Sequence, residues 1–541
     1  MRSLRIIPTV FLTAVLLGAQ TPTPGISPER QPDYQALSTA VRTLRRAATG
    51  EALTAQVDKL VTESGGASRG EARRKLANAL VLLKGAIWDA KQEYQWSLAL
   101  RPDAVIADSS LPLVIRVAQM YPASYKAAEA LKVDVSLRRE DGKVLRRVGV
   151  FDLPAGDLIE QPFGMLAKLD GVADGAYLVR AEVMDGGSGV AVIVSPLVVV
   201  KGITRDHAAI EHRLSLIQGH DGAKGSVRYP YVLAETVNSG RRRWSDADFG
   251  LPYQPQPPYD FVAGVASSNA LLKSIEAGKD PLYRAKGDHE RHYWFDEAGE
   301  MMAYHLYAPL KWDGKSKLPM VLVLHGNTRD QDYYFDRDDH ILAKLAEQHG
   351  YLVVCPMGYR PSAGWGSNSL NRAAAGRGGA PDPSRQRQGD LSEKDALHVL
   401  DLVTSEYPID SNRIYLFGHS AGGAGTWYMG EKYAEKWAAI AASAAATRPA
   451  GFPFERLKGL PILVCHGDQD DEVPVASSRN MVKAAKESGL EPQYLEVPGA
   501  THLTIVALVE PKVFDFFDQH PRKISNSATN AKPAAQGAVR R

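Results

Sequence analysis

The C-terminal half of the chain predicts an α/β domain built on a doubly wound, mostly parallel sheet. From about residue 288, short apolar runs alternate with segments of helical periodicity, as expected for parallel strands joined by helices. Most of these runs are almost continuously apolar, which indicates strands buried on both faces. One run, residues 414–417, breaks into Gly-His-Ser-Ala-Gly at 418–422 and then into a helical segment. This order of strand, sharp turn and helix is typical of a turn that exposes a nucleophilic serine.

The start of the chain predicts a secretory signal peptide over residues 1–19. Basic residues are followed by the mostly apolar run 6–17 and by small residues up to Ala19, where we expect cleavage and export to the periplasm or the medium. An uncleaved N-terminal anchor is the alternative. No later segment is long and apolar enough to predict a stable membrane span. The formal net charge of +2 over 541 residues gives no indication of a nucleic-acid partner.

Composition and periodicity divide the chain ahead of the α/β domain. Residues 20–32 are rich in proline, threonine and serine and predict a disordered lead-in. Apolar residues at helical spacing predict a helical section over 33–130, without catalytic residues. The period then changes to two, which predicts a small antiparallel β-sandwich over 131–202, with an immunoglobulin-like arrangement as one candidate. A helical and linker segment over 203–287 follows, including a proline-rich run at 251–259.

The α/β domain is predicted over residues 288–522, and a disordered tail over 523–541. Its expected strands are residues 304–307, 320–324, 351–355, 414–417, 438–442, 462–465 and 493–497. Its expected helices are residues 341–349, 392–406, 477–488 and 511–519, besides the helix that follows Ser420. In such a sheet, functional groups lie at the carboxyl ends of the strands.

Ser420 is followed in the sequence by an acid-rich loop and then by a histidine, each after its own strand. The loop 466–474 holds three aspartates and a glutamate, and the last strand leads to His502. A serine, an acid and a histidine together supply a nucleophile, an orienting carboxylate and a base for acyl transfer. The N–H of Ala421, at the start of the helix, is placed to meet a developing oxyanion.

From about residue 288 to 520 the chain resembles α/β-hydrolases, in particular bacterial esterases near the dienelactone-hydrolase, feruloyl-esterase and prolyl-oligopeptidase-like catalytic domains. The matching pieces are His325-Gly326, the turn at 418–422, the loop 466–474 with its Val-Pro ending, and Gly-Ala-Thr-His at 499–502. The order serine, acid, histidine is the one that these hydrolases use.

The resemblance implies a role for each matching residue. Ser420 would be the nucleophile, His502 the base and Asp470 the acid, with Asp468 and Asp471 as alternatives for the acid. The second oxyanion donor would come from the turn after the strand 320–324. We expect the N–H of Asn327 there, with Thr328 as the alternative. The sheet order of the family also separates the strands that end in Cys355 and Cys465 by three others, so both are expected to be free, buried thiols.

The segment 359–389 is long for a connection between a strand and a helix, and it leaves the sheet on the catalytic side. It predicts a substrate-binding wall, with Trp365 as a flat apolar surface and Arg372 as a contact for a substrate carboxylate. Arg377, Arg385 and Arg387 are further candidates for that contact. A flexible, solvated loop is the alternative. No histidine stands at a recognised ligand spacing, so we expect neither a metal nor a cofactor.

Together these features predict an exported serine esterase that cleaves a small-molecule or polymer-borne carboxylic ester through an acyl-enzyme. One alternative is a prolyl-oligopeptidase-like peptidase, although the chain lacks the repeats of a propeller domain. Another is a binding or scaffold protein with a vestigial hydrolase domain, in which the β-sandwich would be the working part.

Overall fold

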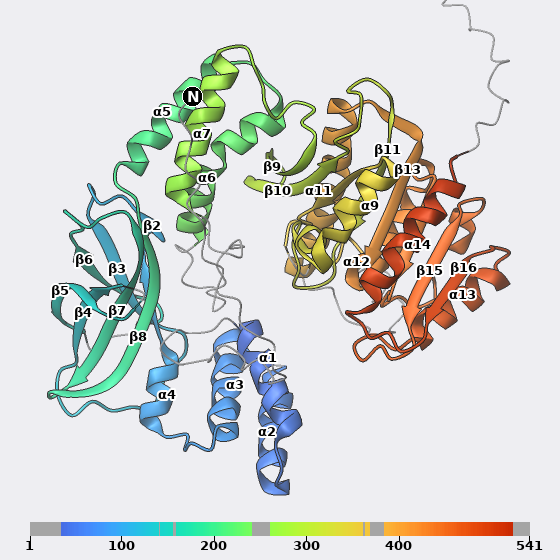
Figure 1. The fold of residues 1–541 in the computed structure, drawn as a ribbon. Coiled ribbons are helices and arrows are strands. Elements are labelled where there is room, and N and C mark those ends of the chain that lie inside the picture. The colour runs from blue at the N-terminus through green and yellow to red at the C-terminus, as the bar shows by residue number, and fades with distance from the viewer. Residues whose placement is uncertain are drawn as a thin grey trace, which may run out of the picture. The chain divides into compact units, whose positions relative to one another are not determined.

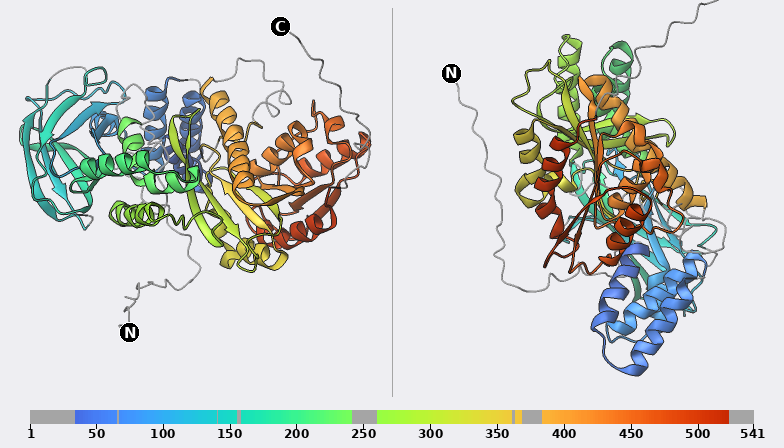
Figure 2. Two further views of the ribbon diagram at one scale, coloured as in Figure 1. Left: turned by 90° about the horizontal axis from the view of Figure 1, so that it is seen from above. Right: turned by 90° about the vertical axis from the view of Figure 1, so that its right-hand side faces the viewer.

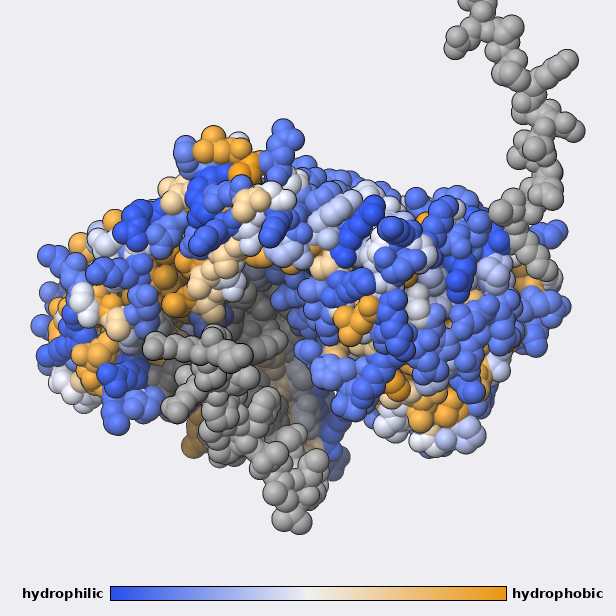
Figure 3. Space-filling view, turned by 45° about the horizontal axis from the view of Figure 1, so that its top comes forward, coloured by the Kyte–Doolittle hydropathy of each residue, from blue (hydrophilic) through white to orange (hydrophobic). Residues whose placement is uncertain are grey.

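The computed structural model describes residues 34–65, 67–139, 141–154, 158–240, 260–360, 363–367 and 383–522. The predicted signal peptide, lead-in, proline-rich run and tail lie outside these ranges. The chain forms two compact units, residues 1–202 with 237–252 and residues 203–236 with 253–541. In the part that the structure describes, we find no helix with the length and apolarity needed to cross a bilayer. The face drawn in Figure 3 is largely hydrophilic, with small apolar areas.

The first unit begins with helices that pack around a small apolar core. Helices α1 to α3 lie side by side (Figure 2), and their core includes Leu37, Val57, Leu76 and Leu80. The helices are α1 (Tyr34–Ala47), α2 (Glu51–Ser64), α3 (Arg69–Leu83) and α4 (Ala90–Ser97). Helical periodicity in this region therefore reflects a buried face shared between neighbouring helices.

Strands follow directly after α4. They are β1 (Leu98–Pro102), β2 (Ile106–Ala107), β3 (Leu113–Gln119), β4 (Lys132–Arg138), β5 (Val144–Asp152), β6 (Phe163–Ala167), β7 (Gly175–Asp185) and β8 (Ser188–Val199). They form one sheet in the order β1-β3-β6 and another in the order β2-β8-β7-β4-β5. One buried apolar cluster takes side chains from both sheets.

The predicted helical section 33–130 was wrong in its second part, because the strands start at Leu98. The alternation that produces them is present in the sequence: Leu113, Ile115 and Val117 are buried, with less buried residues between Leu113 and Val117. Proline at 102 and 112 interrupts this pattern, which shortens the strands and weakens the period of two.

The second unit opens with three helices, α5 (Ile203–Leu216), α6 (Asp221–Gly240) and α7 (Phe261–Glu276). Helix α6 was not predicted, because it contains Gly222, Gly225 and Pro230, which disfavour helix interiors. Gly225 allows a close approach to the main sheet: a Cβ at this position would lie 2.2 Å from the carbonyl oxygen of His292. Contact with the sheet thus compensates for the poor helix propensity.

The main sheet has eight strands in the order β16-β15-β14-β13-β11-β12-β10-β9 (Figure 1). Strands β9 and β10 form an antiparallel hairpin at one edge, and β12 to β16, with β11, run parallel to one another. The strands are β9 (Gly287–Phe295), β10 (Glu300–Ala308), β11 (Leu318–Leu324), β12 (Leu352–Pro356), β13 (Ile409–His419), β14 (Ala439–Ser443), β15 (Ile462–Gly467) and β16 (Gln493–Val497). The predicted doubly wound sheet is confirmed, and β9 is a strand that the sequence analysis did not predict.

Helices cover both faces of this sheet (Figure 1). Leu322 of β11 belongs to the core cluster that contains residues of α11, α12 and α13, whereas its neighbour Val323 belongs to the cluster with α9 and α14. The helices are α8 (Tyr333–Asp336), α9 (Ile341–His349), α11 (Pro383–Glu406), α12 (Ala421–Lys432), α13 (Ala476–Glu487) and α14 (Ile505–Gln519). Cys355 and Cys465 are free and buried, as predicted, on β12 and β15 with three strands between them.

Helix α14 carries an acidic residue, Glu510, inside the apolar core. Its side chain is 0% exposed, and within the described residues neither carboxylate oxygen has a hydrogen-bond partner. Burial raises the pKa of Glu510 to about 8, while Arg337 lowers it and Asp338 raises it. At a pH between these values, about 8 in the folded protein and about 4.3 in the unfolded chain, Glu510 is protonated when folded and ionised when unfolded. Stability falls as the pH rises between these two values.

We expect Glu510→Gln to remove this pH dependence. The stability of the variant relative to wild type should rise by up to about 1.4 kcal/mol per pH unit between about pH 4.3 and pH 8. Urea unfolding at pH 5 and pH 8 measures this difference. Glu487→Gln, at an exposed position on α13, is the matched control and should show little change with pH. Equal pH dependence of Glu510→Gln and wild type would contradict the assignment.

Candidate active site

Ser420 occupies a strained turn between β13 and α12. Its φ of 59° and ψ of −117° are unusual for a residue with a side chain. The N–H of Ser420 donates to the carbonyl oxygen of Ser443 at 2.9 Å, and its own carbonyl accepts from the N–H of Ala424 at 3.0 Å. Hydrogen bonds on both sides therefore hold the serine in this conformation, at the carboxyl end of a central strand.

Glycines on either side of Ser420 let the backbone pack closely enough for this turn. A Cβ at Gly422 would lie 1.9 Å from the carbonyl oxygen of Leu324 on β11. At Gly418 it would lie 2.3 Å from the carbonyl oxygen of Gly422. Neither position has room for a side chain, so the structure supplies the steric reason for the small residues at 418 and 422.

The turn after β11 lies against Ser420. A Cβ at Gly326 would be 3.3 Å from the Cβ and 3.8 Å from the Oγ of Ser420. Asn327 and Thr328 follow at the exposed side of this turn, and Thr328 has a φ of 65°. Ala421 is the first residue of α12, where main-chain N–H groups have no partner within the helix. Both segments predicted to supply oxyanion donors thus flank the serine.

His502 pairs with Asp470. The Nδ1 of His502 lies 2.7 Å from the Oδ2 of Asp470, and the two side chains are 4% and 0% exposed. The alternatives for the acid have other surroundings: Asp468 accepts a hydrogen bond from the N–H of Gly499 at 2.7 Å, and Asp471 is exposed. Of the three aspartates considered, Asp470 is the one that the structure brings to His502.

His419 connects the serine turn to His502. This residue directly precedes Ser420, and its ring centroid lies 4.6 Å from that of His502. Burial lowers the pKa of His419 well below its ordinary value, so its ring is neutral at pH 7.

Glu472 lies near the other ring nitrogen of His502. The Oε2 of Glu472 is 3.8 Å from the Nε2 of His502, and the Glu472 side chain is 60% exposed. The Nε2 of His502 therefore faces the accessible side of the site.

His466 lies beside Asp470, a proximity that the sequence alone did not indicate. Its Nε2 lies 3.1 Å from the Oδ2 of Asp470 and 3.0 Å from the carbonyl oxygen of Val473. Its Nδ1 lies 2.7 Å from the Oγ of Ser478 on α13. The only sequence signal was the presence of a histidine four residues before the candidate acid.

His325 follows the end of β11, and its ring lies against main-chain carbonyl groups. Its Nδ1 lies 2.9 Å from the carbonyl oxygen of Gly326, and its Nε2 lies 2.8 Å from that of Met357. Burial lowers the pKa of His325. Across the described ranges, we find no group of three or more histidine, cysteine, aspartate or glutamate side chains placed to hold a metal ion.

Trp365 differs from its predicted role as a wall of the substrate pocket. Its side chain is 2% exposed, and its Nε1–H donates to the carbonyl oxygen of His325 at 3.0 Å. A Cβ at Gly425 of α12 would lie 2.6 Å from the Cβ of Trp365. The indole is therefore packed beneath the helix that follows Ser420, where it supports the turn and does not face a substrate.

The predicted arginine contacts cannot be placed at the site. Arg372 and Arg377 lie outside the described residues, and Arg385 is at the start of α11. Arg387 is exposed on the same helix. Since α11 begins at Pro383, the predicted loop 359–389 ends in a helix that starts earlier than expected.

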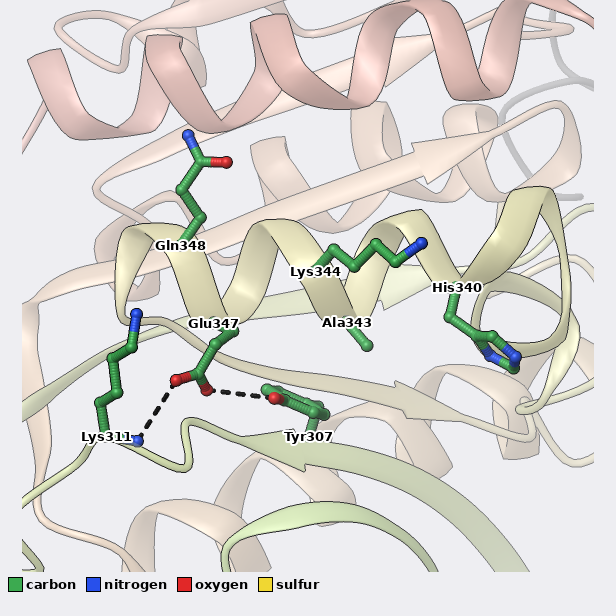
Figure 4. A pocket seen from close by; sticks show the side chains of 7 residues that line it. All are labelled: Tyr307, Lys311, His340, Ala343, Lys344, Glu347 and Gln348. Atoms are coloured by element: carbon green, nitrogen blue, oxygen red, sulfur yellow. Dashed lines mark hydrogen bonds between the residues drawn. The ribbon is translucent and has the colours of Figure 1, made fainter.

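A surface pocket of about 430 Å³ lies along α9 and shares no residue with the Ser420 turn (Figure 4). Its carboxylate, Glu347, accepts hydrogen bonds from the hydroxyl of Tyr307 at 3.0 Å and from the N–H of Lys311 at 3.3 Å. The lining residues are Tyr307, Lys311, His340, Ala343, Lys344, Glu347 and Gln348. Glu347 thus fixes the end of β10, and we do not place the chemistry in this pocket.

Part of the C-terminal domain is similar to known hydrolases. The profile of the family described as phospholipase/carboxylesterase matches residues 382–517. Among solved structures, a ferulic acid esterase from Anaeromyces mucronatus is 18% identical, covers 44% of this chain and 94% of its own, and has a TM-score of 0.35.

Two curated relatives match part of the chain. A bifunctional acetylxylan esterase/xylanase from Neocallimastix patriciarum is 30% identical over 176 residues, which are 32% of this chain and 22% of that protein. A secreted, uncharacterized protein from Arthroderma benhamiae is 30% identical over 243 residues, which are 38% of this chain and 23% of that protein. The chain thus spans less than a quarter of the length of either relative. The family match and the sheet order together confirm the α/β-hydrolase fold.

Proposed function

We propose that this α/β-hydrolase is a serine esterase in which Ser420, His502 and Asp470 form the catalytic triad. The observation that carries the proposal is a serine in a strained turn whose preceding residue, His419, has its ring centroid 4.6 Å from that of His502, the histidine of a buried histidine–aspartate pair. A serine hydroxyl is a weak nucleophile by itself, and a histidine oriented by a carboxylate activates it. The match to a carboxylesterase family supports an ester as the substrate.

In the proposed reaction, the Nε2 of His502 takes the proton of the Ser420 hydroxyl while Oγ attacks the ester carbonyl carbon. The carbonyl oxygen becomes an oxyanion, which the N–H of Ala421 and a donor from the turn after β11 stabilise. For the second donor we propose Asn327, with Thr328 as the alternative. Removing one donor of this kind costs about 2.7–4 kcal/mol in other serine hydrolases. His502 then gives its proton to the leaving alcohol, and an acyl-enzyme remains.

Water completes the cycle. His502 takes a proton from the water as its oxygen attacks the acyl carbon, and it returns the proton to Ser420 Oγ as the carboxylic acid leaves. Asp470 holds the Nδ1–H of His502 throughout the cycle. His502 therefore makes every proton transfer in this cycle, with Ser420, the leaving alcohol and the attacking water as its partners.

The substrate class that we propose is a small-molecule or polymer-borne carboxylic ester. The relative described as an acetylxylan esterase/xylanase makes an acetylated polysaccharide the first polymer to assay. We further propose that the protein is exported, because a basic and then apolar N-terminal segment precedes small residues at a cleavage position. The relative described as secreted supports this localisation.

The proposal is tested by rapid-mixing kinetics with p-nitrophenyl acetate and butyrate. We expect a burst of p-nitrophenol equal to the enzyme concentration, because acylation releases the alcohol before deacylation. A peptide p-nitroanilide is assayed beside the esters and should be cleaved far more slowly. Faster cleavage of the anilide would favour the peptidase alternative. Lack of a burst, together with no labelling by a fluorophosphonate, would favour the scaffold alternative.

A further inference from the structure

We infer that His466 is a positioning residue of this site, which fixes the Asp470 carboxylate and is itself oriented by Ser478 of α13. The inference rests on the proposed function, since it concerns the acid of the proposed triad. Its basis is a continuous line of contacts: Ser478 Oγ to His466 Nδ1 at 2.7 Å, His466 Nε2 to Asp470 Oδ2 at 3.1 Å, and Asp470 Oδ2 to His502 Nδ1 at 2.7 Å.

The surroundings of His466 determine its tautomer. Two acceptors, the carbonyl oxygen of Val473 and the Oδ2 of Asp470, face Nε2, so this nitrogen must carry the hydrogen. In the neutral ring Nδ1 is then an acceptor, and the Ser478 hydroxyl donates to it. A hydroxyl can serve as donor or acceptor, but here only the donor role is left.

Asp470 receives donors on both carboxylate oxygens. Oδ1 accepts the main-chain N–H groups of Glu472 at 2.9 Å and Val473 at 2.7 Å. Oδ2 accepts from His502, and the Nε2 of His466 lies 3.1 Å from the same oxygen. The main-chain donors belong to the same loop as Asp470, whereas His466 lies at the end of β15. His466 is therefore the contact that ties the carboxylate to the sheet.

The contact between His466 and Asp470 is buried, so its loss would not be compensated by solvent. The side chains of His466 and Asp470 are both 0% exposed, and Ser478 is 1% exposed, so bulk water cannot replace a lost donor. Without His466, the carboxylate would be held by its own loop and by His502 alone, and the ring of His502 would follow its movement. Small displacements of a catalytic group can cost up to roughly 100-fold in rate.

The test compares His466→Phe, which keeps an aromatic ring, with His466→Gln, whose amide can donate toward Asp470. For His466→Phe we expect kcat for p-nitrophenyl acetate to fall roughly 10- to 100-fold with little change in KM, because the ester does not touch His466. His466→Gln should recover most of the lost kcat. The rate of labelling by a fluorophosphonate should fall in parallel with kcat, because the same Ser420–His502 pair reacts.

Ser478→Ala, with Ser477→Ala as its matched control on the same helix, tests the second contact. Ser478→Ala should lower kcat several-fold at unchanged KM, and Ser477→Ala should keep wild-type kcat. If His466→Phe does not fold, the comparison of Ser478→Ala with Ser477→Ala still tests whether His466 positions Asp470. The inference is overturned if His466→Phe folds and retains wild-type kcat, if Gln rescues no better than Phe, or if Ser478→Ala equals its control. An inactive wild-type enzyme would instead refute the proposed function.

Discussion

Replacement of Ser420 by alanine is expected to lower kcat for p-nitrophenyl esters by about 10⁶-fold, the loss typical of a serine hydrolase without its nucleophile. The burst of p-nitrophenol should vanish with it, because no acyl-enzyme can form. The residual rate would come from the oxyanion donors and from binding, which still favour attack by water. Thermal unfolding should change little, since alanine keeps the main-chain hydrogen bonds of the turn to Ser443 and Ala424.

The matched control for this variant is Ser443→Ala. Ser443 is a fully buried serine at the end of the neighbouring strand β14, and its carbonyl oxygen, which the substitution keeps, accepts the N–H of Ser420. Its hydroxyl makes only a long contact of 3.4 Å with the Nδ1 of His419. We expect its kcat to stay within about tenfold of wild type. A burst of wild-type size in Ser420→Ala would show that another group is the nucleophile.

The serine turn could be predicted from the sequence because its physical requirements are local. An apolar strand, small residues at 418 and 422 and a helical segment stand next to one another in the chain. The structure adds the contacts that make glycine necessary, since a side chain at Gly422 would collide with Leu324 of another strand. That contact spans about a hundred residues, yet the glycine itself was visible as a local pattern.

The role of Trp365 could not be predicted in the same way. Trp365 contacts the carbonyl of His325 and packs against Gly425. These residues lie tens of positions away in the sequence, one before Trp365 and the other after it. A tryptophan in a long, glycine-rich loop is therefore compatible with a pocket wall or with a core position. Tertiary packing places Trp365 in the core, and the sequence around residue 365 does not indicate this position.

The partner of Asp470 was hidden for a different reason. His466 and Asp470 are four residues apart in a loop, and only the path of the backbone brings His466 Nε2 to within 3.1 Å of the carboxylate. The pairing of Asp470 with His502, by contrast, was implied by the resemblance to α/β-hydrolases, with Asp468 and Asp471 as alternatives. Both loops leave the carboxyl ends of the neighbouring parallel strands β15 and β16. Sequence patterns predict which segments become strands or helices, but they do not predict the conformation of a loop.

Asp470→Asn is expected to lower kcat by roughly 10⁴-fold while the fold and KM are kept. The amide has the shape of the carboxylate, but it lacks the negative charge that stabilises His502 as an imidazolium after it has taken the serine proton. Its NH₂ group can also face the Nδ1 of His502 at 2.7 Å, which would force the proton onto Nε2 and block acceptance from Ser420. Steady-state kinetics and fluorophosphonate labelling should fall together.

Asp468→Asn and Asp471→Asn form the matched series, because the three aspartates lie in one loop and each is replaced by the same isosteric amide. Asp468 binds the N–H of Gly499 at 2.7 Å, so its variant can loosen the loop that leads to His502 and lower stability. Asp471 is exposed and should tolerate the change. If kcat fell by about 10⁴-fold in either of these variants while Asp470→Asn remained active, the acid of the triad would be that residue and not Asp470. We expect the large loss only in Asp470→Asn, because a carboxylate orients a histidine only when it contacts the ring, and Asp470 Oδ2 lies 2.7 Å from His502 Nδ1.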